Sequence, residues 1–153
     1  MRRIFLGLGS NLGDREANLR QAITALESPK LRLLRTSSIY ETEPIGFLDQ
    51  GWFFNLVAEF ETDLFPKQLL ARIQRGERGM GRQRTVKNGP RIIDIDILLY
   101  GTSVIQADEL EIPHPRYRER RFTLAPLAEL APTMKDPVTG RTMAELLLSL
   151  IHI

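Results

Sequence analysis

A chain of 153 residues with 42% hydrophobic and 26% charged residues has the composition of a globular protein, and we expect one domain spanning residues 1–153. No apolar run approaches the ~18 residues of a membrane span, and the N-terminus lacks the cleavage site of a signal peptide, so we expect a cytoplasmic protein with no membrane partner. The absence of cysteine excludes disulfides and thiolate metal sites.

The net charge of +2 is small, but the basic residues are unevenly distributed. Of the 21 Lys and Arg residues, seven lie within residues 72–91 and four within residues 116–121. Most of them are arginines, whose planar guanidinium binds phosphate in a bidentate manner. The distribution therefore indicates a local anion site rather than a uniformly basic protein.

The beginning of the chain predicts a strand followed by a helix. Residues 3–8 are typical of a short strand, and Asp14 is a candidate N-cap for a helix that extends to about Glu27. Gly7 and Gly9 precede this helix, but their spacing to the next glycine differs from that of a dinucleotide-binding motif. We expect them to form a turn that lets backbones approach closely.

Two further strands and a long loop are expected next. Residues 31–40 predict a strand, and residues 41–51 form a loop long enough to be a binding loop or lid. Residues 52–62 alternate as a strand, so Phe53 and Asn55 share one face beside that loop. This pair could sandwich and hydrogen-bond a flat heterocycle. Alternatively, Phe53 belongs to the core and Asn55 satisfies a neighbouring backbone group.

A helix beginning near Pro66 leads into a basic loop. Gln74 and Glu77 are neighbours on this helix, three residues apart. Its three arginines are expected to form a solvated face: Arg72, Arg75 and Arg78. Glycines then end the helix and open a loop with four more basic residues: Arg82, Arg84, Lys87 and Arg91.

The basic loop continues into the apolar segment 92–99, which carries Asp94 and Asp96. On a strand these two side chains point to the same face, with Cα atoms about 6.5–7 Å apart. Burying two carboxylates is costly without a compensating cation, and hard oxygen ligands with open positions suit Mg²⁺ bound to phosphates. Alternatively, both aspartates lie in solvent at a strand end, or pair with Arg82 and Arg91.

The C-terminal part of the chain completes the expected fold. His114 lies between two prolines, which restrict its backbone, so it could contact a phosphate or simply shape a loop. A short helix is expected around residues 124–132, and residues 142–151 predict a closing helix. Together the elements predict a compact α/β or α+β sandwich.

Several motifs, in this order and spacing, resemble the 6-hydroxymethyl-7,8-dihydropterin pyrophosphokinase family over nearly the whole chain. They are LGSNLG at residues 8–13, SIYETEPIG at 38–46, FFN at 53–55, GPRIIDIDILLYG at 89–101 and IPHP at 112–115. The resemblance implies a ferredoxin-like sandwich with a mainly antiparallel sheet, helices on its faces and a substrate cleft. It also implies transfer of pyrophosphate from ATP to the hydroxymethyl group of the reduced pterin in folate biosynthesis, with release of AMP.

The resemblance also assigns roles to residues and cofactors. Two Mg²⁺ ions would bind Asp94 and Asp96, and Arg82 and Arg91 would act in catalysis. The ATP-binding residues implied are Gln74, Glu77, Arg84, Lys87, His114 and Arg120. The pterin-binding residues implied are Thr42, Pro44, Ile45, Phe53, Asn55 and Phe122. The protein would act on ATP and the reduced pterin as a monomer or simple dimer. Some members have Arg-Trp where this chain has Lys87-Asn88.

Two other functions are compatible with parts of the sequence. A nucleic-acid-binding module could use the two arginine clusters, with Phe53 and Phe122 as stacking platforms. The paired aspartates argue against it, because without a metal they would repel a phosphate backbone. A kinase that transfers only the γ-phosphate would need a phosphate loop, and the sequence contains no Walker-type motif.

Overall fold

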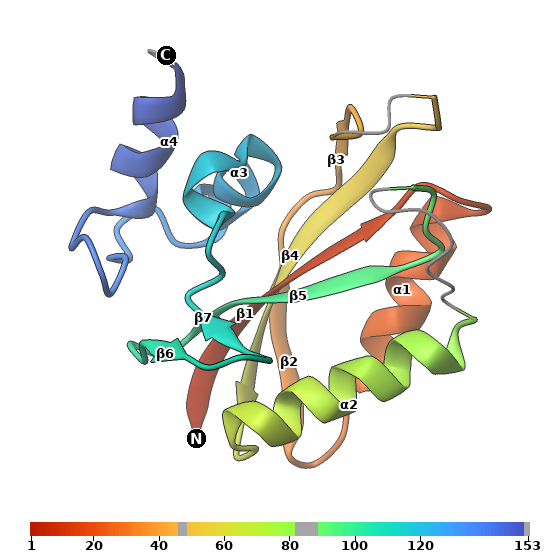
Figure 1. Cartoon of the computed structure of the whole chain (residues 1–153), viewed down its shortest axis with the longest axis horizontal. Helices are drawn as coiled ribbons and strands as arrows, with labels where there is room; N and C mark the ends of the chain where they lie inside the picture. Colours follow the sequence, from red (N-terminus) through yellow and green to blue (C-terminus); the bar gives the residue numbers. More distant parts are fainter. Residues whose placement is uncertain (46–48, 82–88, 152–153) are drawn as a thin grey trace.

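The computed structural model describes residues 1–45, 49–81 and 89–151. In this part of the chain a five-stranded antiparallel sheet is combined with four α-helices (Figure 1). The strands of the sheet are β1 (Arg2–Ser10), β2 (Leu31–Thr36), β3 (Tyr40–Thr42), β4 (Phe53–Thr62) and β5 (Asp94–Tyr100). The helices are α1 (Arg15–Leu26), α2 (Pro66–Gly79), α3 (Arg121–Leu130) and α4 (Met143–Ile151), with a 3-10 turn η1 (Tyr117–Glu119) before α3.

The sheet has the order β2-β4-β1-β5, and the short β3 also pairs with β4. All of these pairings are antiparallel, which confirms the predicted antiparallel sheet. A separate two-stranded ribbon, β6 (Ile105–Gln106) and β7 (Glu111–Ile112), lies after β5. The central position of β1 and β4 means that both strands are paired on each side and contribute to both layers of core.

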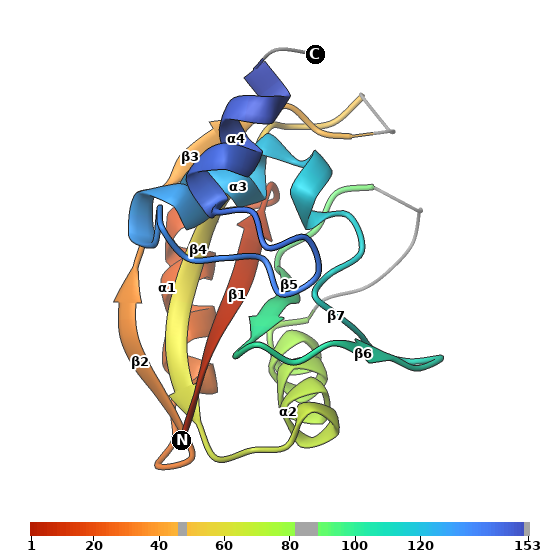
Figure 2. The same cartoon turned by 90° about the vertical axis from the view of Figure 1, so that its left-hand side faces the viewer.

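Helices cover both faces of the sheet (Figures 1 and 2). Because successive side chains of a strand point to opposite faces, Ile4, Leu6 and Leu8 of β1 enter the core under α1 and α2, whereas Phe5 enters the core under α3 and α4. Both cores are well buried, but α3 and α4 cover only part of the second face. The uncovered part of that face is where β1 ends and where β4 and β5 begin.

Three expectations about local structure are wrong. The expected strand 31–40 is two strands, β2 and β3, which both pair with β4 and are separated by residues 37–39. Gly7 and Gly9 lie within β1 rather than in a turn. Arg72 is not simply solvated, since its guanidinium donates hydrogen bonds to the carbonyls of Ala25 (2.9 Å) and Leu26 (3.4 Å) at the end of α1.

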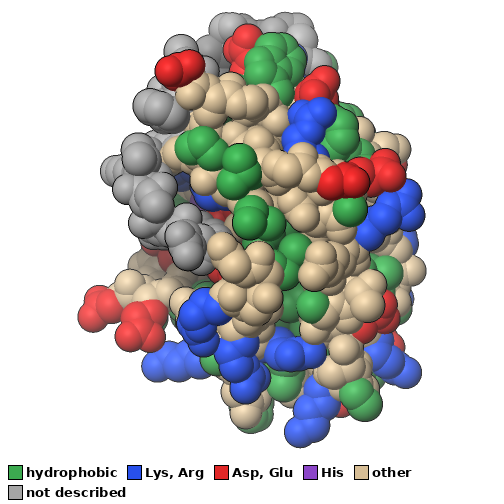
Figure 3. Space-filling model, turned by 90° about the vertical axis from the view of Figure 1, so that its right-hand side faces the viewer, with side chains coloured by type: hydrophobic (Ala, Val, Ile, Leu, Met, Phe, Trp, Pro, Cys, Tyr) green, Lys and Arg blue, Asp and Glu red, His purple; other side chains and the backbone are tan. Residues whose placement is uncertain are grey.

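The outer face of α1 and α2 is more polar than the sheet beneath it. Figure 3 shows Lys and Arg side chains gathered in the lower part of this face. Arg75 and Arg78 of α2 are exposed, as expected for a solvated helix face. No helix in the described part of the chain is long and apolar enough to cross a membrane.

Candidate functional site

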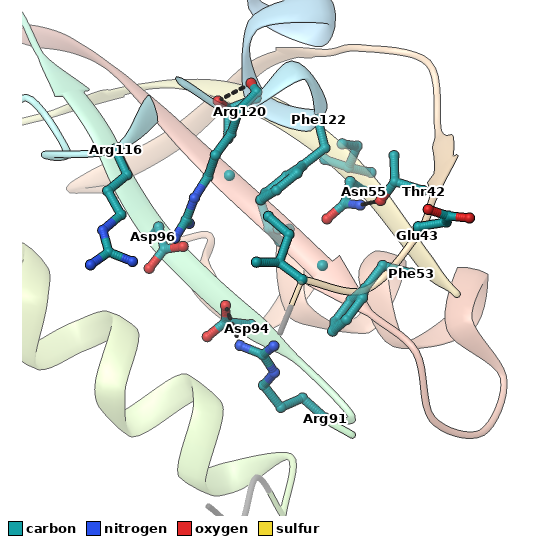
Figure 4. Close-up of a pocket in the computed structure, with 16 residues that line it drawn as sticks. Thr42, Glu43, Phe53, Asn55, Arg91, Asp94, Asp96, Arg116, Arg120 and Phe122 are labelled. Atoms are coloured by element: carbon teal, nitrogen blue, oxygen red, sulfur yellow. Dashed lines mark hydrogen bonds and ion pairs between the residues drawn. The ribbon is translucent and has the colours of Figure 1, made fainter. Parts of the chain in front are cut away.

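A pocket occupies the uncovered part of the sheet, between the ends of the strands and the start of α3 (Figure 4). Its base is formed by Gly7, Leu8 and Gly9 of β1. The other lining residues are Thr42, Glu43, Ile45, Phe53, Asn55, Leu56, Arg91, Asp94, Asp96, Arg116, Arg120, Phe122 and Thr123. Residues that lie up to about 116 positions apart in the sequence therefore meet in one cavity.

Strand register explains how the base of the pocket forms. Gly9 is paired with Asn55 of β4 on one side and with Asp94 of β5 on the other, while Gly7 is paired with Asp96. Directly opposed residues share a face of the sheet. The glycines therefore leave open space between the polar side chains of β4 and β5. A Cβ atom at Gly9 would lie 2.7 Å from Oδ1 of Asn55, so only glycine fits there without displacing the amide.

The two aspartates form the acidic end of the pocket. Asp94 accepts a hydrogen bond of 3.3 Å from Nη1 of Arg91. Burial, followed by the negative charge of Asp94, raises the pKa of Asp96 to about 7, although Arg120 and Arg91 act in the opposite direction. Thus the described cations only partly compensate the pair. Full solvent exposure does not describe this arrangement, and the expected ion pair of Asp94 with Arg91 is present, whereas Arg82 lies outside the described residues.

Glu77 adds a third carboxylate close to the pair. It reaches from α2 to β5, where its Oε2 accepts a 2.9 Å hydrogen bond from the backbone N–H of Ile95, the residue between the aspartates. Its charge also contributes to the raised pKa of Asp96. Gln74, one turn earlier on α2, is exposed and lines a separate surface groove with Lys30 and Arg75. The structure does not bring Gln74 to the pocket.

His114 lies next to the acidic end. Its Nδ1 accepts a 3.1 Å hydrogen bond from the backbone N–H of Arg116, which leaves the proton on Nε2 when the ring is neutral. Burial, and then the positive charge of Arg120, lower the pKa of His114 to about 4. His114 is therefore neutral near pH 7 and can act as a hydrogen-bond donor through Nε2.

The opposite end of the pocket is aromatic and amide-bearing. Figure 4 shows Phe53 and Phe122 on either side of the middle of the pocket, with Asn55 and Thr42, beside Glu43, at the end remote from Asp94 and Asp96. Nδ2 of Asn55 donates a 2.6 Å hydrogen bond to Oγ1 of Thr42. The guanidinium of Arg91 lies 5.0 Å from the ring centre of Phe53, so this arginine contacts both ends of the pocket.

Two polar networks hold η1 and α3, which form the roof of the pocket. Buried Asp136 accepts hydrogen bonds from the hydroxyl of Tyr117, the guanidinium of Arg118 (2.8 Å) and the N–H of Thr139 (2.7 Å), which positions η1. On α3, Glu129 accepts hydrogen bonds from the N–H and hydroxyl groups of Ser38 and from the hydroxyl of Tyr40 (2.6 Å).

These networks fix the positions of residues that themselves line the pocket. The Asp136 network holds the turn between Arg116 and Arg120. The Glu129 network ties α3, which carries Phe122, to β3, which carries Thr42. The separation between the roof and the amide end therefore depends on contacts outside the pocket.

The structure brings most, but not all, of the predicted residues together. Nine of them line the pocket: Thr42, Ile45, Phe53, Asn55, Arg91, Asp94, Asp96, Arg120 and Phe122. Pro44 is buried in the adjoining loop. Arg82, Arg84 and Lys87 lie outside the described residues, so their expected roles stay predictions.

Some pocket residues were absent from the sequence-based set. Gly7, Gly9, Glu43, Arg116 and Thr123 all line the pocket. Arg116 could have been included because it belongs to the second basic cluster, residues 116–121. The two glycines could not be recognised, because their role depends on which strands pair with β1.

The donor set of the acidic end fits a hard divalent cation. It offers two carboxylates on one face of a strand, and the raised pKa of Asp96 shows that the site favours additional positive charge. Among the described residues there is no group of three or more His, Asp or Glu side chains that could enclose a metal by themselves. A cation here would need ligands from water or a substrate, which is the usual situation for Mg²⁺.

Comparison with known proteins identifies the family. The sequence model of the 7,8-dihydro-6-hydroxymethylpterin-pyrophosphokinase (HPPK) family matches residues 5–132. The 2-amino-4-hydroxy-6-hydroxymethyldihydropteridine pyrophosphokinase of Bacillus subtilis is 45% identical over 89% of this chain and 82% of its own length. That of Aquifex aeolicus is 41% identical over 95% of this chain and 90% of its own length. The chain belongs to this family.

Other similar proteins are considerably longer than this chain. The folic acid synthesis protein fol1 of Pneumocystis carinii is 41% identical over 92% of this chain, but this match spans only 19% of the fol1 protein. A crystal structure of Plasmodium falciparum HPPK-DHPS with pteroate superimposes with a TM-score of 0.79 at 19% identity, covering 99% of this chain and 42% of that one. The similarity confirms the predicted ferredoxin-like sandwich.

The raised pKa of Asp96 predicts a specific effect on stability. The folded protein retains a proton that the unfolded chain releases above about pH 4, so the free energy of unfolding falls between about pH 4 and pH 7. Asp96→Asn removes this penalty. Urea denaturation with EDTA should show a smaller loss of stability from pH 5 to pH 8 in Asp96→Asn than in the wild type. The exposed Asp108→Asn is the control, and an unchanged pH dependence in Asp96→Asn would contradict the environment described for Asp96.

The two glycines at the base of the pocket provide a matched pair. Gly9→Ala places a methyl group 2.7 Å from Asn55, whereas the Cβ of Gly7→Ala meets Leu98 at 3.4 Å. We expect Gly9→Ala to lower the free energy of unfolding by about 1–3 kcal/mol and Gly7→Ala by less than about 1 kcal/mol. Urea denaturation measures both, and the side-chain amide NMR signals of Asn55 should shift only in Gly9→Ala. Equal effects would show that Asn55 relaxes without cost.

Proposed function

We propose that the pocket of this pyrophosphokinase holds the triphosphate of ATP and 6-hydroxymethyl-7,8-dihydropterin side by side. Pyrophosphate then passes from ATP to the hydroxymethyl group in folate biosynthesis, and AMP is released. The observation that carries the proposal is the division of one pocket into two chemically different ends. The carboxylates and arginines suit a metal-bound polyphosphate, whereas the aromatic rings and the amide suit a flat, polar-edged heterocycle.

The acidic end is proposed to bind the phosphates. Asp94 and Asp96 would hold Mg²⁺, and two ions are expected. Bound Mg²⁺ would neutralise the phosphate charge and favour ionisation of the attacking hydroxyl. Arg91 and Arg120, which already act on the pair electrostatically, would donate hydrogen bonds to phosphate oxygens. Neutral His114 would donate from Nε2 without needing to be protonated.

The transfer itself needs positioning more than a covalent intermediate. The hydroxymethyl oxygen forms a bond to the β-phosphorus of ATP, and the bond from that phosphorus to the oxygen bridging it to the α-phosphorus breaks. The electron pair leaves with that oxygen on AMP, and the hydroxyl proton is released to solvent. Arg91 lies between the two ends and would stabilise charge on the group in transit.

The other end is proposed to bind the pterin. Phe53 and Phe122 would stack on the two faces of the ring, and Asn55 with Thr42 would hydrogen-bond its polar edge. Ile45, at the mouth of the pocket, would cover the apolar side. A nucleic-acid-binding module is less well supported, because an enclosed carboxylate pair would oppose a phosphate backbone.

The identity of the nucleotide product tests the proposed reaction. Protein mixed with ATP, Mg²⁺ and the reduced hydroxymethylpterin should yield AMP and the pterin diphosphate, measured by anion-exchange chromatography. Asp94→Ala and Asp96→Ala should lower kcat by at least about 10³-fold, since each removes a proposed metal ligand, while circular dichroism shows an intact fold. Formation of ADP, or near-normal rates in either variant, would refute this assignment.

Arg116 is proposed to contact the β- or γ-phosphate. It lines the pocket, and Figure 4 shows it on the same side as Asp96. Arg116→Met should weaken binding of Mg–ATP about tenfold but leave AMP binding within about twofold, because AMP lacks those phosphates. Calorimetric titration measures both affinities. Arg121→Met, an exposed neighbour outside the pocket, is the matched control, and an equal loss for AMP and ATP would place Arg116 elsewhere.

A further inference from the structure

Asn11 joins three segments that meet at the pocket but does not line the pocket itself. It follows the last residue of β1 and is only 8% exposed. Its backbone N–H donates to the carbonyl of Arg91 (3.0 Å), and its Oδ1 accepts from the N–H of Arg91 (2.8 Å). Its Nδ2 donates to Oε1 of Gln50 (2.7 Å) and to the carbonyl of Gly51 (2.9 Å).

The orientation of this side-chain amide is determined by its backbone partners. The N–H of Arg91 can only donate, and the carbonyl of Gly51 can only accept. A reversed amide would face both of them with the wrong group. One short side chain must therefore offer an acceptor to the segment before β5 and a donor to the loop before β4. Asparagine meets this requirement, whereas aspartate supplies only the acceptor and alanine supplies neither.

The two joined segments carry residues from opposite ends of the pocket. Arg91 makes the 3.3 Å contact to Asp94 and lies 5.0 Å from the ring of Phe53. Gln50 and Gly51 belong to the loop that leads through Trp52 into Phe53. The carbonyl of Trp52 also accepts a 3.0 Å hydrogen bond from Arg15, so the loop has a second attachment on α1. Among the described residues, Asn11 links this loop directly to Arg91.

We propose that Asn11 is a positioning residue that sets the spacing between the arginine–carboxylate end and the aromatic end of the pocket. Its side chain holds the loop before β4 against the segment that carries Arg91, without contacting a substrate. This inference rests on the proposed function for its kinetic consequences. Its structural consequences can be measured in the protein without substrates.

Asn11→Asp separates the two connections made by the side chain. The carboxylate keeps an acceptor for the N–H of Arg91 but places negative charge against the carbonyl of Gly51. Trp52 is the only tryptophan of the chain and directly follows Gly51, so its fluorescence reports on this loop. We expect the Trp52 emission of Asn11→Asp to move to longer wavelength, while the amide of Arg91 stays protected from hydrogen exchange in NMR spectra.

A second asparagine provides the matched control. Asn18 of α1 also donates its amide to a backbone carbonyl near the end of β1, that of Leu12 at 2.8 Å. Among the described residues it forms no hydrogen bond with Arg91 or with Gln50 and Gly51 of the loop before β4. Asn18→Asp therefore introduces the same chemical change in the same region. Its Trp52 emission maximum should stay at the wild-type wavelength, and its kinetic constants should stay within about twofold of the wild type.

The kinetic effect should be unequal for the two substrates. In Asn11→Asp we expect KM for the pterin to rise about tenfold, because the loop and Phe53 lose their spacing from Arg91, while KM for ATP changes less than about threefold. A purely structural defect would lower the amount of active enzyme and reduce kcat without this split. Gln50→Ala removes the side-chain partner of Asn11 but keeps the bonds of Asn11 to Arg91 and Gly51, and should change pterin KM in the same direction by about threefold. If Asn11→Asp does not fold, the measurements are made on Gln50→Ala instead.

The possible outcomes distinguish this inference from the proposed function. Altered Trp52 emission together with the selective rise in pterin KM supports the positioning role. Trp52 emission and KM values like those of Asn18→Asp would overturn it. If the wild type itself does not convert the pterin, the proposed function fails. The substrate-free Trp52 and Arg91 signals would then still support or overturn the link that Asn11 makes between the two segments.

Discussion

The burial of Asp96 beside a second carboxylate on one strand face is the constraint on which the pocket depends. Asp94 and Asp96 lie side by side on β5, and burial raises the pKa of Asp96 to about 7. A protein selected only for stability would avoid such an arrangement, because each desolvated charge lowers the free energy of unfolding. The presence of this pair in an otherwise apolar strand is understandable if a ligand bound in the pocket supplies positive charge, as expected for a metal-bound triphosphate.

The remaining elements surround this acidic pair with complementary groups from separate parts of the chain. β1 contributes glycines instead of side chains, so that the surface between β4 and β5 stays open. α3 and η1 contribute the cationic and aromatic roof, and buried networks around Asp136 and Glu129 hold that roof in place. Arg91 and Asn11 connect the two ends. The chemistry of the pocket is thus local, but its dimensions are set by contacts outside it.

Several features of the site were predictable because they depend on short-range geometry. The two-residue period of a strand places Asp94 beside Asp96, and Phe53 on the same face as Asn55, before any pairing is known. The resemblance to the family then implied that both pairs belong to one substrate cleft. Prediction failed where the outcome depended on neighbouring strands: Gly7 and Gly9 resembled a turn, yet they lie within β1. On α2, Glu77 reaches β5, whereas Gln74 lines a separate groove, and its implied role in ATP binding stays a prediction.

The amino-acid sequence by itself determined the family, the antiparallel sandwich and the pairing of carboxylates, since these follow from motif order and from the periodicity of each element. Only the tertiary structure decided which groups share the pocket. Register across β4, β1 and β5 brings Asn55, Gly9 and Asp94 into one row, and the path of the chain after β7 brings Arg116 to the same side of the pocket as Asp96. The physical reason is that strand register and helix docking depend on the packing of the whole core, whereas periodicity depends on the backbone of one segment.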